Sequence, residues 1–297
     1  MFDVKPLLRK IPGAVRVKNY IRPLFVEEPD HIKRSSSPFI SGDSFKCLSN
    51  WIYEFGRVYE NSPKLPGQVE IIFVQKDMVD FFISNIKIHS NPVVIIHNGD
   101  TQESAHQINL LASSCKFIFT TNLEIKKEGM AALPIGIENS HYKKNGDLKY
   151  FQALSESPLN KNIICLTSFN VNTNPIKRLP IRDLCIANGS EFIYPIDLSS
   201  YRKKLSESYF VISPPGNGID CHRTWEAIYH KTVPVIEPGG WLFNDLDLPV
   251  LVVNSFQEFF DMSLEKKLSL YQELINKPLH SAYLNYWTLK IFEKSMV

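Results

Sequence analysis

The chain has 297 residues, of which 44% are hydrophobic, so it can fill one large core or two cores of ordinary domain size, and we expect two. Its 33 basic and 31 acidic residues give a net charge of +2, without the strongly positive field that attracts nucleic acid, so we expect no nucleic-acid partner. The five cysteines include no Cys-x-x-Cys spacing, which argues against a disulfide framework and a zinc knuckle. No apolar run approaches the ~20 residues that cross a bilayer and no signal-peptide pattern is present, so we expect a cytoplasmic protein.

The first 25 residues mix basic and apolar side chains and are interrupted by Pro12 and Gly13. One interpretation is a terminal arm that packs on its own domain. The other is peripheral contact with an anionic inner membrane surface, where each cation contributes about 1 kcal/mol. The break at Pro12 favours the packed arm, because proline interrupts a helix. The basic residues are Lys5, Arg9, Lys10, Arg16, Lys18 and Arg22.

Between residues 68 and 137, short apolar runs alternate with stretches of helical composition. The runs VEIIFVQ, PVVIIH and KFIFTTN are almost continuously apolar, which is typical of parallel strands covered on both faces. The stretches DMVDFFISNI and ESAHQINLLAS lie between them and resemble helices. This βαβαβ pattern predicts a doubly wound α/β domain over residues 1–155.

A polar stretch over residues 138–161 marks the predicted domain boundary. Beyond it, strand-like and helix-like segments alternate again, from NIICLTSF to LPVLVV. We therefore predict a second doubly wound, Rossmann-like domain over residues 156–275, facing the first across a cleft. Residues 276–297 form a predicted C-terminal helix, whose aromatic residues we interpret as core.

The most informative segment is SPPGNGIDCHRTWEAIYHKTVPVI at residues 213–236, a glycine-rich turn that leads into an amphipathic helix and a short strand. Such turns let backbone N–H groups face an anion, and the helix dipole adds to the attraction. Glu226 lies three residues after Arg223, on nearly the same helix face, where it could accept hydrogen bonds from sugar hydroxyls. Clustering of these residues at a strand-to-helix junction favours a nucleotide diphosphate site. The predicted donor-binding residues are Ser213, Pro215, Gly216, Asn217, Gly218, His222, Arg223 and Glu226.

A simpler interpretation of the same segment stays open. Asp220 would be an ordinary N-cap, and Arg223 and Glu226 would form a solvated pair. Arg178 and Tyr194 are further donor-side candidates, for phosphate contact and for stacking on the base. An exposed helix Arg and a half-buried strand Tyr explain them equally well.

The segment FVISPPGNGIDCHRTWEAIYHKTVPVI resembles the donor-site signature of exostosin-like glycosyltransferases. Two further segments, VVIIHNGD at 93–100 and LPIGIEN at 133–139, are similar to acceptor-side strand ends in bacterial and viral relatives. The resemblance implies a GT-B fold whose C-terminal helix crosses back to the first domain. It also implies that Arg223 contacts the donor diphosphate, that Glu226 contacts ribose or sugar hydroxyls, and that the reaction inverts the anomeric centre.

Glycosyl transfer also needs a group that takes the proton of the acceptor. The predicted strand VVIIH is followed by a polar loop at its carboxyl end, where Asp100 is our first candidate for the base and His97 the second. Asp43 and Glu103 are rivals, and an alternative is that Asp100 only caps the next helix. Asn98 and Asp43 are the predicted acceptor-binding residues.

The predicted mechanism uses neither a metal nor a cofactor. Arg223 and the amides of the turn would neutralise the charge on the departing diphosphate. The only Asp-x-Asp spacing of interest, Asp245 to Asp247, lies in a loop where acidic turn residues are ordinary. A UDP-sugar is favoured over a GDP-sugar as the donor.

The sequence thus predicts a metal-independent, inverting glycosyltransferase. It would move a sugar from a nucleotide diphosphate to a glycan or lipid-linked glycan, in the synthesis of a surface polysaccharide. The alternatives are a nucleotide-sugar epimerase or hydrolase, and a non-catalytic protein that binds a glycan or nucleotide.

Overall fold

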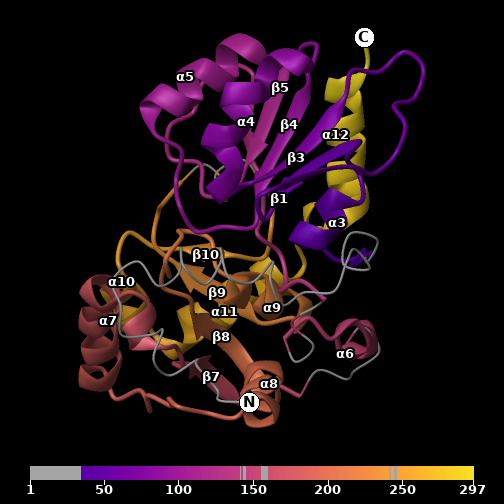
Figure 1. Cartoon of the computed structure of the whole chain (residues 1–297). Coiled ribbons are helices and arrows are strands. Elements are labelled where there is room, and N and C mark those ends of the chain that lie inside the picture. The colour runs from indigo at the N-terminus through magenta and orange to yellow at the C-terminus, as the bar shows by residue number, and fades with distance from the viewer. Residues whose placement is uncertain (1–34, 141, 143–144, 155–159, 241, 244–245) are drawn as a thin grey trace, which may run out of the picture.

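The computed structural model describes residues 35–140, 142, 145–154, 160–240, 242–243 and 246–297. The basic segment at residues 1–25 and Asp245 of the Asp-x-Asp pair therefore lie outside the described residues. The described chain forms two β-sheets with helices packed around them (Figure 1). The prediction of an α/β protein is confirmed.

The first sheet has six strands in the order β2-β1-β3-β4-β5-β6. Strands β1 and β2 form an antiparallel hairpin, and all other neighbours are parallel. Every residue of β3 and β4 is buried, as expected for the continuously apolar central strands. The strands are β1 Trp51–Glu54, β2 Arg57–Glu60, β3 Ile71–Gln75, β4 Val93–His97, β5 Phe117–Thr120 and β6 Met130–Ala132.

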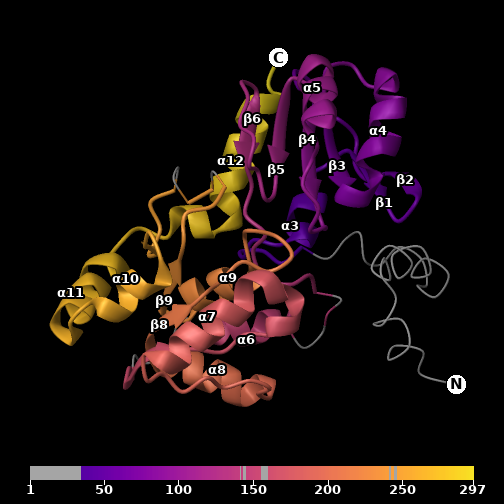
Figure 2. The same cartoon turned by 90° about the vertical axis from the view of Figure 1, so that its left-hand side faces the viewer.

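Helices cover both faces of the first sheet, but they come from distant parts of the chain (Figures 1 and 2). Helices α4 (Val79–Asn85) and α5 (Ala105–Ser114) lie on one face, and α3 (Gly42–Lys46) and α12 (Leu284–Ser295) on the other. The parallel strands of this sheet follow chain order without reversal, unlike a doubly wound sheet. The second face is covered instead by α12, which is held by a hydrogen bond from Val69 N to Ser295 O (2.8 Å).

The second sheet contains four parallel strands in the order β10-β9-β8-β7. Phe192 forms a parallel bridge with Thr167, so its segment lies along the outer edge of β7. The chain therefore moves outward from β7 and then returns to place β8 on its other side. This reversal between β7 and β8 is a topological switch point, where ligands bind beyond the carboxyl ends of the strands. The strands are β7 Ile163–Leu166, β8 Ser208–Ile212, β9 Val233–Ile236 and β10 Leu251–Val252.

The second sheet is covered on both faces by helices that are close to it in the chain. Phe210 and Ile212 share a core with α7, α10 and α11, whereas Val211 packs with α8 and α9. This alternation along β8 places successive side chains on opposite faces, so the parallel sheet is compatible with the predicted Rossmann-like domain. The helices are α7 Pro175–Ala187, α8 Leu198–Glu207, α9 His222–Tyr229, α10 Phe256–Asp261 and α11 Leu264–Ile275.

The stretch predicted to separate two domains contains a further helix, α6 (Leu148–Leu154). Its Phe151 is 2% exposed and contacts Phe39 and Tyr229. The carboxyl edges of the two sheets face each other, with α9 between them (Figure 1). The predicted domain limits stay a prediction. Short 3-10 turns complete the fold at Lys76–Met78, Ile86–Ile88, Val171–Thr173 and His280–Ala282.

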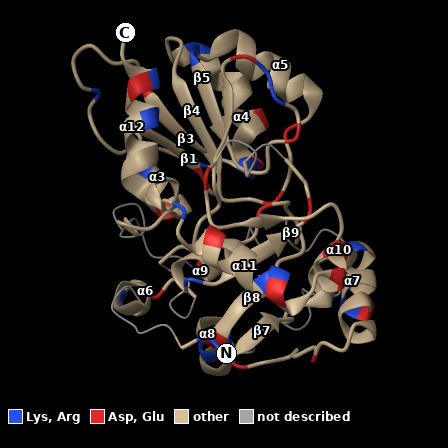
Figure 3. Cartoon of the chain, turned by 180° about the vertical axis from the view of Figure 1, so that it is seen from behind, with Lys and Arg blue, Asp and Glu red and all other residues tan. Residues whose placement is uncertain are grey.

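Charged residues of both signs are interspersed along the elements around both sheets (Figure 3), in keeping with the small net charge. Among the described residues, no helix is both long and apolar enough to span a membrane.

Candidate functional site

The turn between β8 and α9 is held in place by Arg178 of α7. The Nε of Arg178 donates to the carbonyl oxygen of Pro215 (2.9 Å), and Nη2 donates to that of Pro214 (3.2 Å). Its Nη1 donates to the carbonyl oxygen of Asn170 (2.8 Å). Arg178 is 4% exposed, so these hydrogen bonds fix the turn from its buried side. All three nitrogens of the guanidinium donate to backbone carbonyls in this way. The geometry therefore does not favour the predicted contact of Arg178 with phosphate.

Arg223, in the first turn of α9, has donors that nothing in the described chain uses. Its Nε and Nη1 are both buried and lack a hydrogen-bond partner among the described residues. The centre of the guanidinium lies 5.8 Å from the ring of Phe169, which follows β7. An unpaired buried donor costs about 1–3 kcal/mol, so native proteins retain few of them without a functional reason. A bound anion would satisfy these donors.

The start of α9 is also suited to an anion. Its N-cap residue, Cys221, makes no side-chain capping hydrogen bond, so the partial positive charge of the helix end is not offset by a capping side chain. The site lies between Phe169, after β7, and the turn after β8. These are the two strand ends that flank the switch point of the second sheet.

Glu226 lies one turn further along α9. The hydroxyl of Tyr201, on α8, donates to its Oε2 (3.4 Å). Burial raises the pKa of Glu226, and the positive charges of His222 and Arg223 act in the opposite direction. Glu226 is therefore a half-buried acceptor beside Arg223, rather than half of a solvated surface pair.

The glycines of the turn have a different role from the one predicted. The N–H of Gly216 donates to the carbonyl oxygen of Gly218 (2.9 Å), so this amide does not face an anion. A Cβ on Gly218 would lie 2.4 Å from Nδ2 of Asn122, in the loop after β5. Gly218 is therefore needed for the close approach of the two sheets' loops.

Asp220 joins the two sheets and does not cap α9. Its Oδ2 accepts a hydrogen bond from Ile135 N (2.8 Å), and its own N–H donates to Oδ1 of Asn122 (2.9 Å). The indole Nε1 of Trp225 also donates to this carboxylate (2.9 Å). Burial raises the pKa of Asp220 to about 6. The N-cap interpretation of Asp220 is therefore wrong.

Asn217 and Asp100 also meet across the gap between the sheets. The Nδ2 of Asn217 donates to Oδ2 of Asp100 (3.0 Å), and both side chains are exposed. Helix α5 is capped by Ser104, not by Asp100. The structure thus brings the predicted base to the predicted donor turn and removes the alternative that Asp100 is only a cap. Ser213 lies deeper, where its hydroxyl contacts that of Thr224 (2.9 Å).

His222 spans the same gap from the first turn of α9. Its Nδ1 lies 2.7 Å from the carbonyl oxygen of Gly136, and its Nε2 lies 3.6 Å from Oε1 of Glu138. Both side chains are partly exposed, at 31% for His222 and 27% for Glu138. An imidazole and a carboxylate therefore face each other beside Arg223.

His97, the second candidate for the base, is 2% exposed and fully engaged. Its Nε2 lies 3.1 Å from the carbonyl oxygen of Pro134, and its Nδ1 accepts the N–H of Asn98 (2.7 Å). Burial lowers the pKa of His97 to about 4, so it is neutral near pH 7. With both nitrogens occupied it is a structural residue, and the expectation that it faces the cleft is not met.

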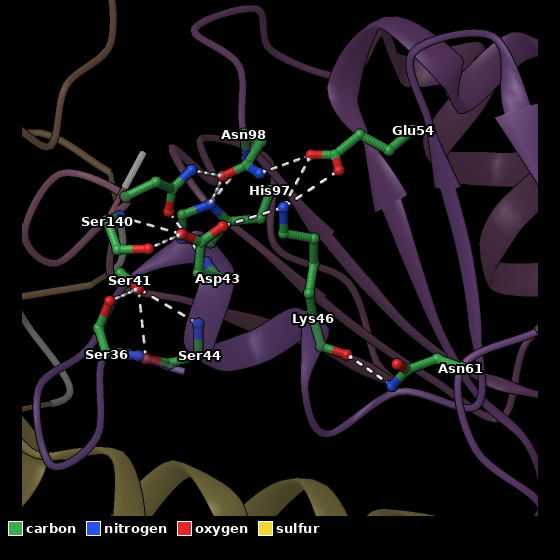
Figure 4. Close-up of polar contacts among 11 residues, drawn as sticks. Ser36, Ser41, Asp43, Ser44, Lys46, Glu54, Asn61, His97, Asn98 and Ser140 are labelled. Carbon is green, nitrogen blue, oxygen red and sulfur yellow. Dashed lines mark hydrogen bonds and ion pairs between the residues drawn. The ribbon is translucent and has the colours of Figure 1, made fainter. Parts of the chain in front are cut away.

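The predicted acceptor residues Asp43 and Asn98 belong to a buried polar network at the carboxyl end of the first sheet (Figure 4). Lys46 Nζ lies between Asp43 Oδ1 (2.9 Å) and Glu54 Oε2 (3.1 Å). Asn98 Nδ2 donates to Glu54 Oε1 (2.9 Å), and its Oδ1 accepts from Asn139 Nδ2 (3.1 Å). Asp43 and Lys46 are each 2% exposed, so neither meets an acceptor in this arrangement.

Glu103, the remaining rival for the base, is paired with Lys76 (Oε1 to Nζ, 2.7 Å). Lys76 also donates to the carbonyl oxygen of Thr121 (2.8 Å), and both charged side chains are buried. Burial lowers the pKa of Lys76, and Glu103 opposes that effect. This buried pair is better suited to fixing the strand ends than to taking up a proton.

A cavity of about 600 Å³ adjoins the turn between β8 and α9. Its volume is within the usual range of ligand sites. Ser213 and Pro215 of the turn form one wall, and Ile236 to Gly240, after β9, form another. Lys177 of α7 and Glu124, after β5, contribute charges of opposite sign. Tyr194 is 42% exposed at the carboxyl end of the segment beside β7, and its stacking on a base stays a prediction.

Within the described ranges, no group of three or more His, Cys, Asp or Glu side chains is placed to hold a metal ion. The chain matches no protein-family model, and a search of curated proteins found no match either.

The sequence did not single out several residues of this site. Tyr201 and Phe169 contact Glu226 and Arg223 only because α8 and the end of β7 pack beside α9. Glu138 is the first residue of the polar stretch that the sequence predicts as a domain boundary. It follows LPIGI, and a carboxylate directly after an apolar strand-like run is the signal that could have identified it.

Proposed function

We propose that this protein is an inverting glycosyltransferase that takes its sugar from a nucleotide diphosphate, with a GT-B-like arrangement of two Rossmann-like units. The nucleotide diphosphate binds at the switch point of the second sheet, and the acceptor glycan enters between the two sheets. Arg223 carries the proposal, because its two buried and unpaired donors at the start of α9 suit an anion.

Further support comes from the groups around Arg223. Glu226 offers a half-buried oxygen for the hydroxyls of a ribose or sugar, and the cavity beside Ser213 and Pro215 offers space for the rest of the donor. Asp100, His222 and Glu138 make contacts across the facing carboxyl edges of the sheets, which supports an acceptor site there.

The remaining parts of the proposal follow the sequence. A guanidinium and a helix N-terminus can together neutralise a departing diphosphate, so the reaction needs no metal or cofactor. We favour a UDP-sugar as donor and a glycan or lipid-linked glycan of a surface polysaccharide as acceptor. The reaction would take place in the cytoplasm, at or near the inner membrane surface.

The test measures nucleotide binding by the full chain. Calorimetry and thermal shift with UDP, GDP, CMP and TDP, and with their sugars, should show saturable binding for one nucleotide family. Arg223→Ala should weaken that binding about 10- to 150-fold, the equivalent of about 1.5–3 kcal/mol for hydrogen bonds to a charged group. Without ligand, the same variant should be as stable as the native chain or more stable, because it no longer buries unpaired donors.

Arg182→Ala is the matched control, because Arg182 is a partly exposed α7 residue that pairs with its neighbour Asp183. It should bind nucleotide like the native chain. Failure of every nucleotide to bind the folded protein would refute the proposed donor site. Equal affinity in Arg223→Ala and the native chain would remove Arg223 from it. Nucleotide binding without any sugar transfer or hydrolysis would favour a non-catalytic binding protein.

A further inference from the structure

The imidazole of His222 is held in one tautomer by the first sheet. A carbonyl oxygen can only accept a hydrogen bond, so the 2.7 Å contact with Gly136 requires the proton on Nδ1. In the neutral ring, Nε2 therefore carries a free lone pair. This nitrogen faces Glu138 at 3.6 Å, which is beyond hydrogen-bond distance.

A ligand can approach this pair from its exposed side. Both side chains keep more than a quarter of their surface exposed. A hydroxyl group that approaches from that side could donate to Nε2 while the nearby carboxylate stabilises the charge that develops on the ring. Glu226 interacts electrostatically with both His222 and Arg223, so a hydroxyl beside His222 lies near the proposed diphosphate site.

Other candidates for the base fit the structure less well. His97 is neutral and buried, and its two nitrogens are occupied. Asp43 and Glu103 are tied to buried lysines. Asp100 is exposed, but its Oδ2 accepts the amide of Asn217. His222 alone among these residues combines a fixed tautomer, a free acceptor atom and partial exposure.

We propose that His222, assisted by Glu138, is the general base of the transfer reaction; this inference rests on the proposed function. The acceptor hydroxyl gives its proton to Nε2 as its oxygen bonds to the anomeric carbon. The bond from that carbon to the diphosphate oxygen breaks, and its electron pair leaves with the diphosphate beside Arg223. The proton on His222 is later released to water, so the products are a glycoside, a nucleoside diphosphate and a proton.

The charged groups around His222 set its pH response. Burial lowers the pKa of His222, but Glu138, the carbonyl of Gly136, Glu226 and Asp220 together raise it above the ordinary value. From β4, the ring of His97 also lies close to His222, and it is neutral near pH 7. A base must be unprotonated to act, so kcat should increase with pH as His222 loses its proton.

The experiment compares His222→Gln, Glu138→Gln and Asp100→Asn in the full chain. It uses the nucleotide sugar that stabilises the protein most and measures release of the nucleoside diphosphate, with water or added glycan as acceptor. His222→Gln should lower kcat about 100- to 10,000-fold, the usual contribution of a general base. Its affinity for the nucleoside diphosphate should stay within about threefold of the native value. Its unfolding midpoint should match that of the native chain. Glu138→Gln should lower kcat less and move the acidic limb of the pH profile to lower pH, because it removes a negative charge beside the ring.

The matched control is His106→Gln, an exposed residue of α5, which should leave kcat unchanged. A kcat of His222→Gln within about threefold of native would overturn the assignment, as would a loss of turnover confined to Asp100→Asn. If the acidic limb of the pH profile does not move in Glu138→Gln, the proposed assistance of His222 by Glu138 is refuted. If the native chain binds no nucleotide and releases none from any nucleotide sugar, the proposed function itself fails. If the protein binds and turns over a nucleotide sugar and His222→Gln changes neither, only the assignment of His222 as the base is refuted.

Discussion

The carboxylate of Asp220 should make the stability of the protein depend on pH in a way that one substitution removes. It is 5% exposed and accepts hydrogen bonds from Ile135 N and Trp225 Nε1. Burial raises its pKa to about 6 in the native state, compared with about 3.9 in an unfolded chain. The native state therefore holds this proton more tightly than the unfolded state does.

The size of the effect follows from these two values. A tenfold difference in proton affinity corresponds to about 1.4 kcal/mol, so the contribution of Asp220 is about 3 kcal/mol. It is fully present below about pH 4, where Asp220 is protonated in both states. It is lost as pH rises towards about 6, so this term makes the free energy of unfolding fall with rising pH.

Urea unfolding of the native chain and of Asp220→Asn at intervals from pH 4 to pH 7.5 would test this reasoning. The amide keeps an acceptor for Ile135 but does not titrate. The free energy of unfolding of the native chain, relative to the variant, should fall by about 2.5 kcal/mol over this range. Asp183→Asn, at an exposed Asp, controls for general charge effects. Parallel pH profiles for the native chain and Asp220→Asn would refute the argument.

Two further predictions concern contacts at the facing edges of the sheets. Gly218→Ala should lower the free energy of unfolding by about 1–3 kcal/mol, because its Cβ would lie 2.4 Å from Asn122. Gly239→Ala is the control: its Cβ would meet only a methyl of Ile219 at 3.0 Å, so it should lower the free energy of unfolding less in the same urea assay. Lys76→Met should cost about 3–5 kcal/mol by leaving Glu103 buried without its partner, whereas Lys266→Met, at an exposed site, should cost almost nothing. A loss in Gly239→Ala equal to that in Gly218→Ala, or a Lys76→Met variant as stable as the native chain, would contradict these assignments.

The sequence predicted the fold well where local pattern determines it. The continuously apolar runs that became β3 and β4 are buried strands that pair in parallel, and the turn at 213–221 does join a strand to a helix. The way in which the first sheet is covered was not predictable in this manner. No local pattern indicates that α12, rather than a crossover helix, packs on its second face.

Prediction of the site was limited by contacts between distant segments. Arg223 stands out because its neighbours in sequence resemble an anion site, and the structure leaves its donors unpaired. Asp220 sits one residue before the N-cap, and only its contact with Ile135 reveals its role. His97 occupies a strand end, as a catalytic residue often does, but the backbone of Pro134 covers it. Burial of a polar group is a tertiary property, and a strand-end position alone does not specify it.

The placement of α12 has a consequence for synthesis of the protein. Trp287 and Ile291 complete the core of a sheet whose own strands lie between residues 51 and 132. As the chain leaves the ribosome, the part of this sheet's apolar face that α3 does not cover stays exposed while the second sheet emerges and folds. A nascent chain held before α12 should therefore bind holdase chaperones, and release of α12 should end that association. A helix that follows both sheets in the chain thus completes the core of the sheet that is translated first.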